Sequence, residues 1–183
     1  MNRKEITKKL SEILINTRLR GFGKHWASEV TIDWGHGRGS EKRIDFMLFE
    51  PENQLSVAGI ERGTFTCYEV KSCREDVYSG NGLTFIGDKN YLVTTMQTWK
   101  DIQDDWRSGK LDKHIRECNP ESTQYYGIMV AVPLLSAAVD EYKNPTPLDD
   151  ADRWELHIVN QCRSGYRKRS ITELLFYMLR SGH

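Results

Sequence analysis

The feature that most limits the fold is the segment YYGIMVAVP at residues 125–133, an almost continuous apolar run closed by Pro133. Strands that are buried on both faces have such runs, whereas half-exposed strands alternate apolar and polar residues. We therefore predict a buried central strand here. The stretch near residues 136–153 contains two prolines and five acidic residues, which predicts an exposed excursion. The β pattern then returns at residues 154–162 (WELHIVNQC).

Helical spacing of apolar residues occurs in three other segments. Residues 3–20 predict an amphipathic helix, and residues 96–118 predict a second helix that is interrupted at its single glycine. The third pattern, residues 170–181, begins with Ser170 and has Glu173 at the spacing of a capping box, an arrangement that marks a helix start. We therefore expect helices near both ends of the chain.

Four further segments have β character: residues 28–34, 42–50, 63–72 and 90–95. The first two are separated by GHGRGSE, whose glycines suit a hairpin loop, so they predict an antiparallel pair. The resulting order is helix, three strands, loop, strand, helix, strand, strand, helix. This order predicts an α/β fold with a central mixed β-sheet flanked by helices. One domain, residues 1–183, accommodates all of these elements.

The composition limits which partners and which cellular compartment we expect. Lys plus Arg (26) balances Asp plus Glu (26), which argues against a broadly basic surface for indiscriminate nucleic-acid binding. The four cysteines have no spacing typical of a zinc site or a disulfide framework, so we expect a reducing, cytoplasmic compartment. No apolar stretch is long enough for a membrane helix, and we expect neither a membrane partner nor an organic cofactor.

Charged residues interrupt two of the predicted strands. Alternation along a strand sends Glu69 and Lys71 to one face, and Asp45 on the preceding strand comes level with Glu69 if the two strands pair. Two adjacent carboxylates repel, so one takes up a proton unless a divalent cation lies between them. Oxygen ligands of this kind suit Mg²⁺ or Mn²⁺, and a lysine beside such an ion suits phosphodiester hydrolysis.

The motif RID at residues 43–45, followed by EVK at residues 69–71, resembles the PD-(D/E)xK nuclease superfamily, with Ile44 in place of the proline. The initial helix and three strands also match that superfamily's core order. The resemblance implies a restriction-endonuclease-like core in the order αβββαβ, here with an extra strand and a C-terminal helix. Over roughly residues 28–133 the pattern looks like the MmcB-like branch, which is associated with DNA repair and with phage and mobile-element genomes.

The resemblance implies a DNA nuclease that depends on Mg²⁺ or Mn²⁺. It implies that Asp45 and Glu69 are metal ligands, that the Val70 carbonyl is a further ligand, and that Lys71 is the catalytic lysine. Members of the superfamily often supply another carboxylate near the first strand, and Glu29 matches that position here.

DNA contacts are predicted from a local basic patch, RSGYRKRS at residues 163–170, in which an aromatic residue is interleaved with cations. The predicted contact residues are Arg163, Arg167, Lys168 and Arg169, together with Lys89 from the irregular segment after the EVK motif. That segment is either a loop that closes over the substrate or a simple connector. Asp76 within it matches a further acid of the MmcB-like pattern, which implies a supporting role beside the metal ligands; the alternative, which we favour, is a solvated turn.

Other interpretations remain open at this stage. The three charged strand residues could form a structural ion pair on a half-exposed sheet. The chain could also be a catalytically inactive nuclease-fold module that binds DNA or a repair partner. A homodimer is a further expectation, although no segment identifies its interface.

Overall fold

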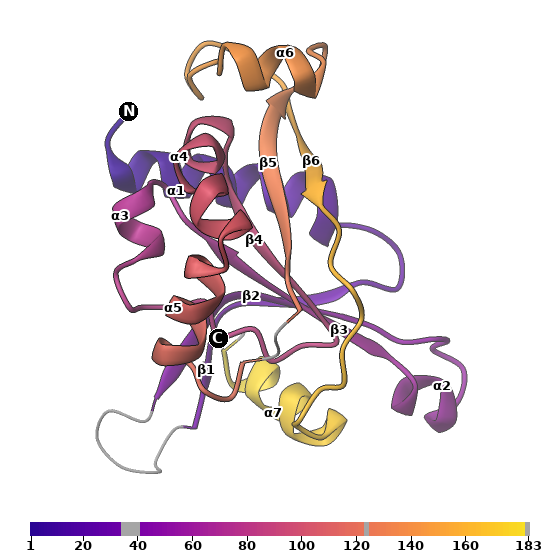
Figure 1. Ribbon diagram of the computed structural model, residues 1–183. Helices are drawn as coiled ribbons and strands as arrows, with labels where there is room; N and C mark the ends of the chain where they lie inside the picture. Colours follow the sequence, from indigo (N-terminus) through magenta and orange to yellow (C-terminus); the bar gives the residue numbers. More distant parts are fainter. Residues whose placement is uncertain (34–40, 123–124, 182–183) are drawn as a thin grey trace.

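The computed structural model describes residues 1–33, 41–122 and 125–181. Within these residues, six strands form a single mixed sheet with helices on both of its faces, which confirms the predicted α/β class (Figure 1). The strands are β1 (His25–Ile32), β2 (Lys42–Glu50), β3 (Thr64–Val70), β4 (Lys89–Thr95), β5 (Gly127–Pro133) and β6 (Trp154–Asn160). The helices are α1 (Arg3–Leu14), the π-helical turn η1 (Ile15–Leu19), α2 (Val57–Glu61), α3 (Arg74–Val77), α4 (Met96–Arg107), α5 (Lys110–Cys118), α6 (Ala138–Lys143) and α7 (Ile171–Ser181).

The strands lie in the sheet in the same order as in the chain, from β1 to β6. Strand β2 runs antiparallel to both β1 and β3, and β6 runs antiparallel to β5. Strand β4 runs parallel to both β3 and β5, and these crossovers carry the helical segments α3 and α4–α5. Every residue of β5 is buried, as its apolar run predicts. It is not the middle strand, however, because only β6 lies beyond it.

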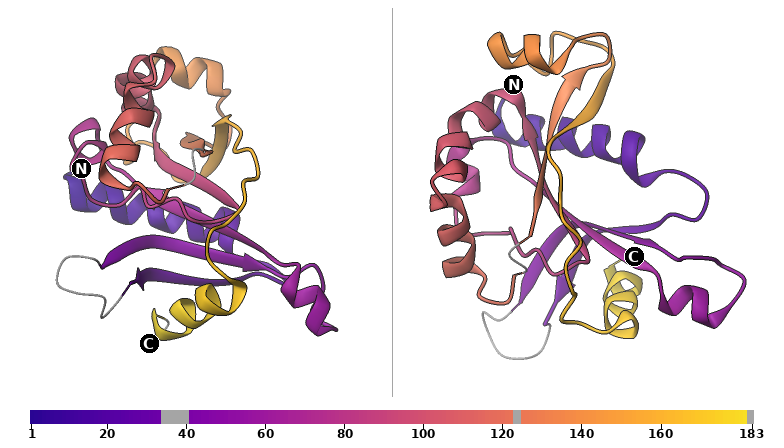
Figure 2. Two further views of the ribbon diagram at one scale, coloured as in Figure 1. Left: turned by 60° about the horizontal axis from the view of Figure 1, so that its bottom comes forward. Right: turned by 45° about the vertical axis from the view of Figure 1, so that its right-hand side comes forward.

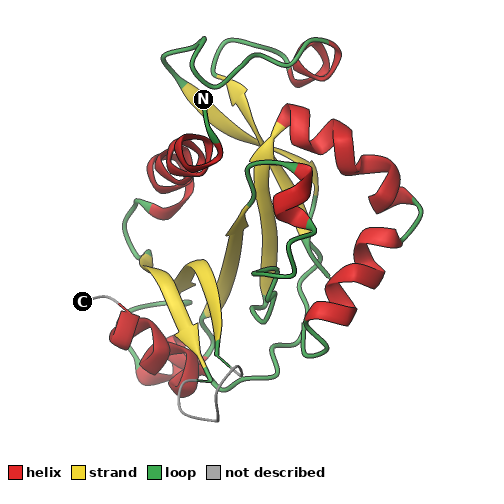
Figure 3. Ribbon diagram, turned by 90° about the vertical axis from the view of Figure 1, so that its left-hand side faces the viewer, coloured by secondary structure: helices red, strands yellow, loops and turns green. Residues whose placement is uncertain are grey.

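Three apolar clusters fill the space between the sheet and the helices. One lies under α1 and includes Tyr68 and Val70 of β3. A second lies under α4 and α5, on the opposite side of the sheet from α1 (Figure 3). The third lies under α7, which covers β1 and β2 on the side away from α1 (Figure 2). The face opposite α1 is therefore covered by two separate helical layers, with β3 between them.

The helix predictions hold with small changes of boundary. The predicted helix 3–20 is α1 followed by η1, and the predicted break in 96–118 falls at Gly109, whose φ of 76° separates α4 from α5. The N–H of Glu173 donates to the Ser170 hydroxyl at 3.2 Å, as the capping-box spacing predicts. Within the described residues, no helix has both the length and the apolar character needed to cross a bilayer.

The connections hold more structure than the sequence indicates. The segments between β2 and β3 and after β3 contain the short helices α2 and α3, which were not predicted. The predicted exposed excursion near 136–153 contains α6, and Glu141 and Leu148 within it are buried. Glu141 is buried because its carboxylate accepts the backbone N–H and the hydroxyl of Thr146. The predicted hairpin loop between β1 and β2 lies almost entirely outside the described residues.

Candidate active site

A polar pocket of about 760 Å³ opens beside the strands β1, β2 and β3. Residues of α1, of the segment after β3 and of the end of α5 complete its wall. Asp45, Val70 and Lys71 line it, as does Glu29 from β1. The structure thus brings four of the five residues predicted as catalytic or metal-binding to one cavity. The fifth, Glu69, lies directly behind the wall of this cavity.

The register of the sheet aligns the two central acids. Strands β2 and β3 pair Phe46 with Tyr68, so Asp45 lies opposite Glu69 as predicted. The backbone hydrogen-bond ladder between these strands ends at Phe46 and Tyr68. Beyond it, the N–H of Val70 donates to Asp45 Oδ2 at 2.7 Å, so a side chain takes over the role of a main-chain acceptor. This exchange fixes the Asp45 carboxylate against β3.

Glu69 is fully buried, and its two carboxylate oxygens differ. Oε1 accepts the N–H of Thr84 at 3.1 Å, whereas Oε2 has no hydrogen-bond partner among the described residues. Burial, and after it the negative charge of Asp45, raises the pKa of Glu69 to about 8. A buried carboxylate with an unsatisfied oxygen is costly. It is therefore a candidate ligand for a cation.

The carboxyl of Asp45 is affected by the same surroundings. Burial raises its pKa above the ordinary value, and the negative charge of Glu29 acts in the same direction. The hydrogen bond from Val70 and the positive charge of Lys71 oppose the rise. The two acids are thus held close together in a site that disfavours two negative charges without a cation.

Lys71 lies on the same face of β3 as Glu69, since the intervening Val70 packs in the cluster under α1. The side chain is buried, and Nζ donates to the carbonyl oxygen of Asn81 at 2.7 Å. Nζ also lies 3.7 Å from Oδ1 of Asp76. Asp76 accepts the backbone N–H and the hydroxyl of Ser72 and lines the pocket, so its interpretation as a solvated-turn residue is wrong.

A short segment, residues 81–84, crosses over Glu69 and Lys71; we call it the strap. Its Gly82 has a φ of 72°, a left-handed conformation that favours glycine. A Cβ atom on Gly82 would lie 2.7 Å from Glu69 Oε2 and 3.2 Å from Lys71 Nζ. A glycine is therefore required at this position for a steric reason as well. The strap thus covers two site residues; whether this segment also closes over a substrate stays a prediction.

Glu29 is opposite Asp45 in the register, because β1 and β2 pair Ser28 with Phe46 and Val30 with Ile44. Its φ of 55° is unusual for a non-glycine residue within a strand. The carboxylate forms an ion pair with Arg43 at 2.7 Å, and both side chains are more than half exposed. Among the described residues, no group of three or more His, Cys, Asp or Glu side chains is close enough to hold a metal ion.

The predicted DNA-contact residues lie elsewhere, and none of them lines the polar pocket. Arg163 and Lys168 are exposed, and Lys89 is partly exposed at the start of β4. Arg167 forms an ion pair with Asp88 at 2.7 Å and also donates to a backbone carbonyl.

Arg169, the fifth predicted DNA contact, is surrounded by acidic residues. It forms ion pairs with Asp33 at 2.8 Å, with Glu121 at 3.0 Å and with Glu173 at 2.7 Å. Its side chain is only 18% exposed. Arg169 therefore joins the start of α7 to the end of β1 and to the segment after α5, a structural role that the basic sequence pattern did not indicate.

Sequence reasoning missed two residues of the site. Gly82 holds the strap close to the acids, and Asn119, at the end of α5, lines the pocket and donates to the strap. The irregular, glycine-rich sequence around residue 82 was the only signal for the first. Asn119 gave none, because its role depends on a contact with residues 36 and 37 positions away.

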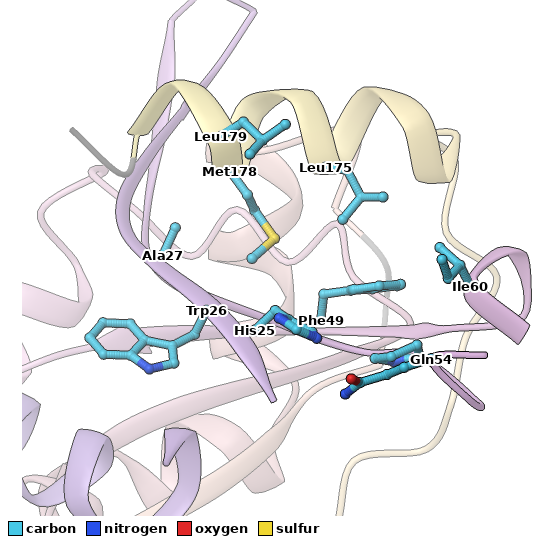
Figure 4. Close-up of a pocket in the computed structure, with 10 residues that line it drawn as sticks. His25, Trp26, Ala27, Phe49, Gln54, Ile60, Leu175, Met178 and Leu179 are labelled. Atoms are coloured by element: carbon cyan, nitrogen blue, oxygen red, sulfur yellow. The ribbon is translucent and has the colours of Figure 1, made fainter. Parts of the chain in front are cut away.

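A second cavity, of about 670 Å³, lies at the other end of β1 and β2 and is mainly apolar. Figure 4 shows Met178 and Leu175 of α7 pointing toward Phe49 of β2 across this space. Of the residues that the structure describes, His25 is the one acidic or basic residue that lines it. The polar pocket is therefore the better candidate for catalysis.

Comparison with protein-family models, curated proteins and solved structures finds no match.

Proposed function

We propose that the chain is a DNA nuclease dependent on Mg²⁺ or Mn²⁺, with a restriction-endonuclease-like core of the PD-(D/E)xK type. One observation carries the proposal: Asp45, Glu69 and Lys71 converge from neighbouring strands, and one oxygen of the buried Glu69 carboxylate has no partner. A purely structural ion pair would satisfy that oxygen. The free cysteines and the absence of a membrane-spanning helix from the described residues support a cytoplasmic enzyme.

The donor set suits a hard divalent cation. Asp45 and Glu69 supply carboxylate oxygens, and the Val70 carbonyl is a third oxygen on the same side. Val70 directs its backbone polar groups toward β2, because the next residue, Lys71, donates its N–H to Val93 on β4. Mg²⁺ and Mn²⁺ favour such oxygen ligands and complete their shell with water. The bound ion would supply Lewis-acid polarisation of a phosphoryl oxygen.

Lys71 and Glu29 supply the other roles that the proposal assigns to side chains of this chain. Lys71 presents an ammonium group that the Asn81 carbonyl and Asp76 hold in place. An ammonium in this position orients the attacking water and offsets negative charge on the phosphate. Glu29, partnered by Arg43 at the pocket wall, is the additional carboxylate that the proposal assigns to the catalytic set.

An anionic substrate is supported by two further cations. Lys42 and Arg43, at the start of β2, line the pocket next to Asp45. They offer direct contacts to the phosphates that flank a scissile bond. Arg163, Lys168 and Lys89 remain candidates for more distant backbone contacts, since the structure leaves all three at least partly exposed.

The test is a cleavage assay with labelled single-stranded, nicked and branched DNA, in Mg²⁺, in Mn²⁺ and in chelator. We expect metal-dependent cleavage that Asp45→Ala abolishes. Asp104→Ala is the matched control, because Asp104 is an exposed carboxylate on the surface of α4. If no substrate is cut in either metal, or if Asp45→Ala cuts as well as the parent, the enzyme proposal is wrong.

A second candidate, a catalytically inactive nuclease-fold module that binds DNA, is favoured by one observation. The Glu69 carboxylate is completely covered and lies behind the pocket wall. This candidate predicts salt-sensitive DNA binding that survives Glu69→Ala, with no cleavage by the parent protein. The enzyme predicts cleavage that this substitution removes.

A further inference from the structure

The strap contacts both proposed catalytic side chains through its backbone. The carbonyl of Asn81 accepts Lys71 Nζ at 2.7 Å, and the N–H of Thr84 donates to Glu69 Oε1 at 3.1 Å. Residues 81 and 84 are the first and last of the strap. A displacement of the strap would therefore move the hydrogen-bond acceptor of Lys71 and the hydrogen-bond donor to Glu69 at the same time.

The carbonyl groups of the two residues between them accept hydrogen bonds from one side chain. Asn119 Nδ2 donates to the carbonyl of Gly82 at 2.8 Å and to the carbonyl of Leu83 at 3.2 Å. Asn119 is 4% exposed, and it is fixed as the C-cap of α5, where its N–H donates to the carbonyl of Ile115. The side-chain amide of Asn119 thus reaches the strap from the end of α5, which also lines the pocket.

The strap does not adopt a conformation that its sequence favours. Leu83 has a φ of 55° and Phe85, just beyond the strap, has a φ of 40°, and both values are uncommon for residues with a side chain. Such conformations persist only where the surroundings enforce them. Both side chains are buried, and Phe85 stacks on Tyr126 with ring centroids 5.1 Å apart. The two hydrogen bonds from Asn119 add polar contacts that help to hold the strap in this conformation.

We propose that Asn119 is a positioning residue for the nuclease site. It fixes the strap backbone, and through this backbone it sets the places of the Glu69 carboxylate and the Lys71 ammonium. This inference rests on the proposed function for its catalytic consequence. The structural link from Asn119 to Thr84 and Glu69 is independent of that function and is measured separately.

The experiment compares Asn119→Ala with Asn144→Ala. Asn144 is the C-cap of α6, with nearly the same backbone angles (φ −130°, ψ 88°) as Asn119 (φ −136°, ψ 79°), but it is exposed. Loss of a helix cap is therefore common to both variants, whereas loss of the strap anchor is unique to one. We expect Asn119→Ala to lower kcat by about 10- to 100-fold, with KM within about twofold, and Asn144→Ala to change neither.

Amide hydrogen exchange of Thr84 supplies a readout that does not require activity. We expect this amide to be protected in the parent protein and to exchange at least about tenfold faster in Asn119→Ala, while amides of β5 keep their protection. If Asn119→Ala fails to fold, exchange in the parent protein still provides a result that can overturn the proposal. A Thr84 amide that exchanges there as fast as those of an exposed loop overturns the proposal.

The outcomes separate the two proposals. A parent protein that does not cleave DNA, yet shows faster Thr84 exchange in Asn119→Ala, overturns the nuclease function and supports the structural link. A parent protein that cleaves, with kcat unchanged in Asn119→Ala, overturns the positioning role and leaves the nuclease function standing. An equal fall of kcat in Asn144→Ala also overturns the positioning role, because it assigns the effect to capping.

Discussion

Two acidic residues of this protein, Glu69 and Asp105, are neutralised in opposite ways. Asp105 on α4 receives Arg74 at 2.7 Å, Lys110 at 3.0 Å and the Tyr78 hydroxyl at 2.9 Å. The hydrogen bond from Arg74, supported by these other partners, lowers the pKa of Asp105 to about 2. Glu69 lies deeper, and burial raises its pKa to about 8 although backbone N–H groups and the charge of Lys71 oppose the rise. The protein supplies the cations for Asp105 and leaves Glu69 to take up a proton or an external cation.

The difference indicates where function lies. A carboxylate that the fold satisfies needs nothing more, whereas an unsatisfied carboxylate beside a second acid is costly to keep and is characteristic of functional sites. The Arg169 cluster resembles Asp105 in this respect, because its charges compensate one another. Behind the polar pocket, in contrast, one oxygen of the buried Glu69 carboxylate has no hydrogen-bond partner among the described residues.

The largest expected effect separates the lysines of the two regions. If the proposed function holds, Lys71→Met should lower kcat by about 1000-fold, because it removes the ammonium proposed to lie beside the scissile phosphate, a loss of about 4 kcal/mol of transition-state stabilisation. Lys110→Met should leave kcat unchanged, since Lys110 forms its ion pair with Asp105. Single-turnover cleavage rates measure both. Equal rates for the two variants would remove the distinction between the regions.

The next effect concerns the pH dependence of stability without metal. The pKa of Glu69 is about 8 in the folded protein against an ordinary value of 4.5, so the fold favours the protonated form. Stability should therefore fall as pH rises from about 4.5 to about 8, by up to about 1.4 kcal/mol per pH unit. Glu69→Gln should lack this loss. Urea unfolding in chelator at pH 5 and pH 8 measures the difference, and parallel pH profiles would contradict it.

Metal should reverse that loss at the same residue. At a metal concentration 100 times the dissociation constant, Mn²⁺ should stabilise the parent protein by about 2.7 kcal/mol, because the ion binds only the folded chain. Glu69→Gln should show a much smaller gain, and Asp105→Asn should keep the full gain. Thermal unfolding with and without Mn²⁺ is the measurement. A shift in Tm that is equal in all three proteins would place the ion elsewhere.

The smallest effect belongs to Asp105. Its pKa is lowered from 3.8 to about 2, so its ion pairs contribute stability above about pH 4 that is lost as pH falls toward 2. Asp105→Asn should be less stable than the parent by about 1 kcal/mol at pH 6, the scale of a partly exposed pair. The two proteins should converge near pH 2. Acid titration of stability measures this, and a gap that persists at low pH would mean that packing, not charge, is lost.

The sequence was sufficient for the features that depend on short-range patterns. Alternation placed Glu69 and Lys71 on one face, and the consecutive β segments placed Asp45 opposite Glu69, as the register confirms. Each of these inferences needs only the period of a strand and the pairing of neighbours in the chain. The same reasoning predicted the capped start of α7.

The sequence was insufficient where a residue's role depends on a distant partner. Arg167 and Arg169 appear in a basic run, yet they are paired with Asp88 and Glu121, far away in the chain. The backbone of Glu29 is left-handed within a strand, which no local pattern predicts. Asn119 likewise has a role only because the strap comes to it. Tertiary contacts, not propensity, decide all of these.

The hydrogen bond between the Val70 N–H and Asp45 has a practical consequence. Asp45 completes the β2–β3 ladder with a side chain, so one residue serves both the architecture and the proposed chemistry. Asparagine offers the same acceptor oxygen without the negative charge. Asp45→Asn is therefore the substitution of choice for an intact protein without the proposed cleavage activity, and so for cocrystallisation trials with uncut DNA.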